Sequence, residues 1–77
     1  MSEQMARLWK LADRIGVAKM RTELVRNPDR AIRDQFAIDA QIEGTKAWAI
    51  NQCMAMANPS CTYSDEQCAQ ITSALGV

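Results

Sequence analysis

The sequence contains no histidine, and its 77 residues include two prolines, three glycines and four aromatic residues. Without histidine, no imidazole nitrogen is available as a zinc ligand. The three cysteines stand eight and seven residues apart, which does not match the two-residue gap of a zinc knuckle. No motif for an activated nucleophile is present. We therefore predict a non-enzymatic protein that uses no metal ion and no cofactor.

Long apolar runs are also absent. No stretch approaches the roughly 20 residues that span a bilayer, and Glu3, Arg7 and Lys10 interrupt the segment where a signal peptide would be apolar. These absences predict a cytoplasmic protein with no membrane partner. In a reducing cytoplasm we expect Cys61 and Cys68 to be free thiols, although a disulfide between neighbouring cysteines of the tail is the alternative.

The zero net charge conceals two oppositely charged halves. Residues 1–33 carry eight basic and four acidic side chains, whereas residues 34–77 carry one basic and five acidic side chains, so the halves are +4 and −4. Such a split favours an anionic ligand at one end or head-to-tail association between copies. The hydrophobic content of 48% argues against disorder and predicts a single domain over residues 1–77.

Helix signals begin at the N-terminus, and no strand is predicted. Ser2 suits an N-cap, and Gly16 ends or bends the first arm, residues 1–26. Between them an apolar stripe recurs at helical spacing. Its members are Met5, Leu8, Trp9, Ala12 and Ile15.

Asn27 and Pro28 mark the start of a second helix, because proline fits the first helical position. From there to about residue 57 only Gly44 opposes a helix, at a cost of ~1 kcal/mol. We therefore predict one long helix over 28–57.

A capping-box sequence opens at Ser64 and predicts a short helix over 64–75, with Cys68, Ile71 and Leu75 facing inward. The predicted fold class is all-α: a helical hairpin with one long helix and a short C-terminal helix. Because a chain of this length buries a modest core, we expect it to be oligomeric.

The long helix would carry two apolar stripes, more than one neighbouring arm can cover. We expect a second copy to cover the stripe that its own arm leaves open. Trp48 stands among polar residues and is a further contact candidate. The predicted interface residues are Ile38, Ile42, Ala49, Cys53 and Trp48.

Charged side chains stand between these stripes. Glu43 and Lys46 are three residues apart and can pair on a helix, whereas Asp39 needs a basic partner from the first arm. Arg26, Arg30 and Arg33 surround the turn at 27–28 and are the predicted ligand-binding residues, with guanidinium groups near a helix N-terminus. Neutralisation by nearby aspartates or by the acidic half of another copy is the alternative.

Residues 11–17 resemble the first helix and turn of a helix-turn-helix, with a small residue, Ala12, four before the turn glycine. The second helix would be 18–26, where Lys19 and Arg21 can reach phosphates or bases. Thr22 departs from the aliphatic residue of that motif. This resemblance implies an alternative function, a DNA-binding regulator that dimerises through the long helix.

A second resemblance extends over residues 33–49. The pairs Arg33-Asp34, Ile42-Glu43 and Trp48-Ala49 resemble the second helix of the phage helical-hairpin family that includes anti-CBASS cyclic-oligonucleotide sponges. The chain departs from that family's pattern at Gly44 and Ile50. The resemblance implies a small oligomeric phage protein that sequesters a cyclic nucleotide in the host cytoplasm. A third alternative is an anti-defence inhibitor that binds a host protein directly.

Overall fold

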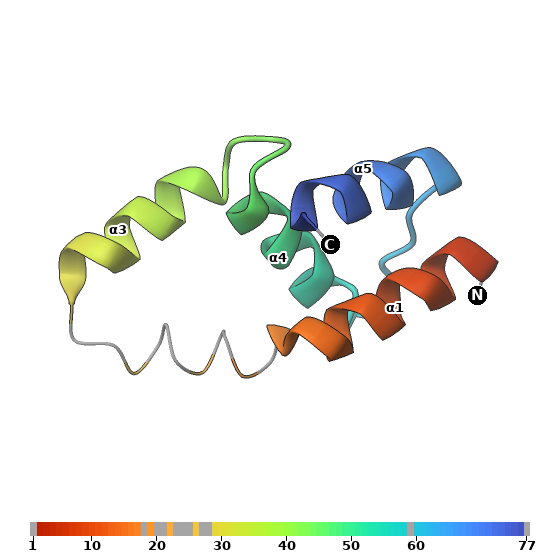
Figure 1. Ribbon diagram of the computed structural model, residues 1–77, viewed down its shortest axis with the longest axis horizontal. Coiled ribbons are helices and arrows are strands. Elements are labelled where there is room, and N and C mark those ends of the chain that lie inside the picture. Colours follow the sequence, from red (N-terminus) through yellow and green to blue (C-terminus); the bar gives the residue numbers. More distant parts are fainter. Residues whose placement is uncertain are drawn as a thin grey trace.

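The computed structural model is all-helical in the part of the chain that it describes (Figure 1). It describes residues 2–17, 19, 22, 26, 29–58 and 60–76. The helices in these ranges are α1 (Glu3–Ile15), α3 (Arg30–Asp39), α4 (Lys46–Ala55) and α5 (Asp65–Leu75). The described residues contain no strand, which confirms the predicted all-α class.

The first helix begins and ends where the sequence predicts. The Ser2 hydroxyl accepts a hydrogen bond from the backbone N–H of Met5 at 3.1 Å, which satisfies a donor of the first turn. Gly16 ends the helix at a φ of +71°, a left-handed conformation that glycine adopts without strain. Residues 17, 19, 22 and 26 are also helical, whereas most of the 18–26 helix of the helix-turn-helix interpretation lies outside the described residues.

The segment predicted as one helix over 28–57 contains two helices. α3 ends at Asp39, residues 40–45 form turns, and α4 begins at Lys46. The prediction of a continuous helix is therefore wrong at its middle. Asn27 and Pro28, the predicted start, lie outside the described residues.

Two adjacent residues explain this break. Gly44 has a φ of +90°, which L side chains rarely adopt. Thr45 is the N-cap of α4: its hydroxyl oxygen accepts from the backbone N–H of Trp48 at 3.1 Å. The same hydroxyl donates toward the carbonyl oxygen of Ile42 at 2.8 Å. A glycine followed by a capping threonine is thus the sequence signal that a continuous-helix interpretation misses.

The last helix confirms its predicted capping box. The Ser64 hydroxyl accepts from the backbone N–H of Gln67 at 3.2 Å, and the Gln67 side-chain oxygen accepts from the backbone N–H of Ser64 at 2.9 Å. The helix therefore starts at Asp65, one residue after the predicted position. Its predicted inward residues, Cys68, Ile71 and Leu75, are all buried.

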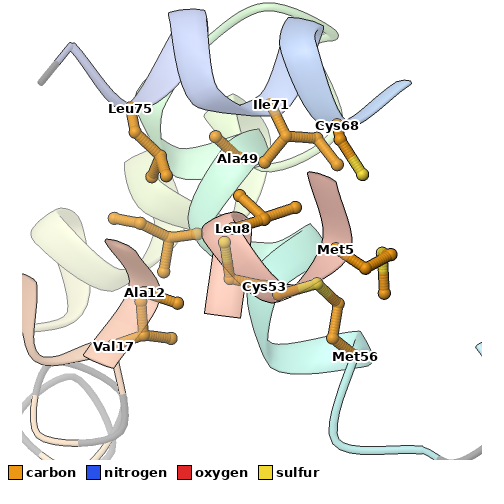
Figure 2. Packing of buried hydrophobic residues seen from close by; sticks show 11 residues of the cluster. Met5, Leu8, Ala12, Val17, Ala49, Cys53, Met56, Cys68, Ile71 and Leu75 are labelled. Atoms are coloured by element: carbon orange, nitrogen blue, oxygen red, sulfur yellow. The ribbon is translucent and has the colours of Figure 1, made fainter. Parts of the chain in front are cut away.

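The core lies between α1, α4 and α5 (Figure 2). Because the chain turns at 40–45, α4 packs against both α1 and α5, while α3 contacts α4 and contributes no buried residue. The fold therefore buries its apolar side chains within one copy and leaves α3 at the periphery. The buried cluster comprises Met5, Leu8, Ala12, Val17, Ala49, Ile50, Cys53, Met56, Cys68, Ile71 and Leu75.

Candidate binding surfaces

Helix α3 is the most exposed helix of the described structure. The molecule measures 38 × 24 × 20 Å, and α3 lies toward one end of its longest axis (Figure 1). Phe36 is half-buried against the core, whereas Ile32 is 51% exposed and Ile38 is 56% exposed. Ile42, in the turn after α3, is 51% exposed. A contiguous patch of exposed apolar side chains marks a contact surface, and these three isoleucines are the candidates for such a patch among the described residues.

The start of α3 differs from the predicted phosphate site. Its N-cap is Asp29, rather than the predicted Asn27, and one carboxylate oxygen of Asp29 accepts from the backbone N–H groups of Ala31 at 3.1 Å and Ile32 at 3.4 Å. This carboxylate occupies the donors that a bound anion would use and compensates the helix dipole. An anion at this end would therefore depend on guanidinium groups rather than on the helix N-terminus.

The three predicted ligand-binding arginines are all exposed. Arg30 and Arg33 stand three residues apart in the first turn of α3, and Arg26 precedes that helix. In the described part of the chain the ion pair is Arg7–Glu3, at 2.9 Å, so these arginines have no carboxylate partner there. The structure thus leaves basic side chains beside the exposed isoleucines of α3.

The predicted interface residues fall into two groups. Ile38 and Ile42 are exposed, as a contact surface requires. Ala49 and Cys53 are 0% and 3% exposed and belong to the core of their own chain, so the second apolar stripe needs no other copy to cover it. This part of the interface prediction is corrected because the turn at 40–45 brings α1 and α5 onto α4.

Trp48, the remaining interface residue, is half-buried in a groove between α4 and α5. The groove has a volume of about 570 Å³. Two acidic side chains, Glu43 from the turn and Glu66 from α5, line it beside the indole. The sequence predicts an ion pair between Glu43 and Lys46, but the described structure does not contain it. The other lining residues are Gly44, Ala69, Gln70, Ser73 and Ala74.

This groove is the feature that sequence reasoning missed. Its acids are 23 positions apart in the sequence and belong to different elements. No local spacing links them, because their proximity depends on how α5 packs on α4. The one usable signal is Trp48, an aromatic residue among polar neighbours.

Two of the three cysteines, Cys53 and Cys68, are buried. All three are free thiols, and burial raises the pKa of Cys53 to about 11. The pKa of Cys68 is also raised, first by burial and then by the charge of Asp65. Neutral, buried thiols are poor nucleophiles. Half-exposed Cys61 lies in a separate groove beside Tyr63.

Tyr63 is a structural residue. Its hydroxyl lies 2.9 Å from the side-chain oxygen of Gln52 and 3.2 Å from the Gln52 carbonyl oxygen. Burial raises the pKa of Tyr63 above its usual value, and a hydrogen bond with Cys61 adds to this effect. A neutral phenol therefore fixes the segment before α5 against α4.

Among the described residues, no helix has the length and apolar character needed to cross a bilayer. Within the same ranges, no group of three or more acidic, cysteine or histidine side chains is placed to hold a metal ion. Comparison of the chain with protein-family models, curated proteins and solved structures finds no significant match.

Proposed function

We propose that this protein is a small helical binding protein that acts by binding a target protein through the exposed surface of α3. The observation that carries the proposal is that α3 has no buried residue although it presents Ile32 and Ile38. Burying such side chains at a contact stabilises it by about 25 cal/mol per Å² of apolar area. The folded chain alone gains little of this energy from α3.

The basic side chains of α3 indicate which kind of protein surface it would bind. Arg30 and Arg33 are exposed on the first turn of α3, and arginine makes two-pronged hydrogen bonds to carboxylates. An acidic and partly apolar protein surface complements this combination. Direct inhibition of a host protein, one of the functions expected from the sequence, is the biological form that this geometry favours.

The test compares two variants that introduce the same negative charge on different surfaces. Ile38→Asp changes the exposed side of α3, and Asn51→Asp changes an exposed position of α4. Proteins retained by the wild-type chain from a lysate of its source organism are identified and then titrated by calorimetry. We expect Ile38→Asp to weaken binding at least tenfold, and Asn51→Asp to leave binding unchanged.

Thermal unfolding checks that both variants fold, because neither position is buried. Equal binding by Ile38→Asp and wild type would refute α3 as the contact surface. A wild-type chain that retains no protein and does not associate with itself would refute the proposal altogether.

A second candidate function is sequestration of an anionic nucleotide at the interface of a homo-oligomer. It is favoured by Arg26, Arg30 and Arg33, which are exposed and have no carboxylate partner in the described structure. In a phage setting, as the family resemblance implies, binding would hide a cyclic nucleotide from its effector. The Asp29 cap opposes this function, since it places a carboxylate among the groups that would hold phosphate.

Calorimetry with a panel of cyclic dinucleotides and trinucleotides tests this second function. Arg30→Glu should abolish any heat of binding with little change in melting temperature, because Arg30 is exposed. Absence of heat with every nucleotide would refute it. A DNA titration at two salt concentrations tests the regulator alternative, since DNA binding weakens steeply with salt.

A further inference from the structure

The groove between α4 and α5 has the chemistry of a receptor for a cationic side chain. Glu43 and Glu66 supply two carboxylates, and the half-buried indole of Trp48 supplies an aromatic surface between the helices. An arginine fits this set, because its planar guanidinium stacks on an indole and bonds carboxylates through two N–H groups. The remaining lining is small or neutral, so nothing described in the groove repels a cation.

The carboxylates of the groove have no cationic partner within the described chain. Lys46, the nearest base in the sequence, forms no ion pair with Glu43. Residues 34–77 hold Lys46 as their single base against five acids. Apart from Lys46, any cation that a copy of this chain supplies to the groove comes from residues 1–33.

The same chain carries the complementary surface. Arg30 and Arg33 are exposed on α3, beside Ile32, and have no carboxylate partner in the described structure. They stand away from their own groove, because α3 extends about 14 Å from Arg30 to Asp39 at 1.5 Å per residue. Glu43 follows the far end of that helix, and Figure 1 shows the start of α3 pointing away from α5.

We propose that the groove around Trp48 binds the arginines of α3 from a second copy of this chain. The proposal rests on the proposed function in that it uses the same α3 surface, and it names another copy as one partner of that surface. A two-fold axis would repeat the contact, with each copy giving an α3 and receiving one. The +4 and −4 halves of two copies would then face each other.

A charge exchange tests the contact sharply. The first variant, Arg30→Glu with Arg33→Glu, has an acidic α3 and an acidic groove. The second variant, Glu43→Lys with Glu66→Lys, keeps Arg30 and Arg33 on α3 and has a basic groove. Sedimentation velocity should show a wild-type dimer, a monomer for each variant alone, and a dimer when the two variants are mixed.

A matched control changes charge next to the groove without entering it. Asp65 precedes Glu66 in the sequence but does not line the groove. Asp65→Lys should therefore leave the dimer intact. Trp48→Phe keeps an aromatic ring but weakens the interaction with a cation, and should weaken association about 2- to 30-fold. Tryptophan fluorescence should also change with protein concentration in wild type and should not change in Trp48→Phe, which retains Trp9.

Two results would overturn the inference. One is a wild-type chain that stays monomeric up to about 1 mM, the range of the weakest specific association. The other is a pair of exchanged variants that dimerise separately or fail to dimerise when mixed. Either result leaves the capture experiment with Ile38→Asp to decide whether α3 binds a different protein, so failure of the contact between copies is distinguished from failure of the proposed function.

Discussion

Replacing Gly44 with alanine distinguishes the observed fold from the continuous helix that the sequence predicts. Gly44 has a φ of +90°, and a Cβ added there would meet no atom within 4 Å, so any penalty comes from the backbone alone. A residue other than glycine in such a conformation costs about 1–3 kcal/mol. Lower entropy of the unfolded chain offsets about 0.4–1 kcal/mol of this cost.

The net expectation for Gly44→Ala is a loss of about 1 kcal/mol of unfolding free energy. For a domain of 77 residues this lowers the melting temperature by about 4–8 °C. In a continuous helix the same substitution would remove a helix-weakening glycine and stabilise the protein by about 1 kcal/mol. The two structures therefore predict opposite signs for one measurement.

Thermal and urea unfolding followed by circular dichroism measure this sign. Gly44→Asn is the control, because asparagine tolerates a left-handed backbone better than alanine and should destabilise the protein less. A higher melting temperature for Gly44→Ala than for wild type would refute the break between α3 and α4.

Three further predictions concern the core and the thiols. Leu8→Ala should lower the free energy of unfolding by about 2–5 kcal/mol in urea titrations, because Leu8 is 1% exposed. Burial of Cys53 should contribute its full stabilisation below pH 9.0, the ordinary thiol pKa. The free energy of unfolding should then fall by about 2–3 kcal/mol toward pH 11, because over that range the Cys53 thiol ionises in the unfolded chain and stays neutral in the folded one. Cys53→Ala should flatten this pH dependence. Cys61 should react with iodoacetamide before Cys53 and Cys68 do, as mass spectrometry of peptides would show, and equal rates would contradict their burial.

Local chemistry made both ends of the fold predictable. Ser2, Gly16 and Ser64 act through hydrogen bonds and backbone angles within three or four residues, so their roles can be inferred without tertiary structure. The prediction of a continuous helix over 28–57 was wrong for a related reason. Gly44 and Thr45 also form a local signal, but either residue alone is tolerated inside a helix, so neither one by itself predicts that one helix ends and another begins there.

The predicted interface failed at Ala49 and Cys53 because the break at Gly44 changes what the apolar stripes face. A straight helix would hold both stripes along one axis, where a single arm can cover only one of them. Two shorter helices allow α4 to enter the core while α3 stays outside. Exposed large apolar side chains in the described residues are thereby concentrated on α3 and its following turn, on the same element as Arg30 and Arg33. The continuous-helix error therefore placed Ala49 and Cys53 of α4 in the interface, whereas the break moves the exposed apolar surface to α3 and leaves Trp48 as the contact candidate on α4.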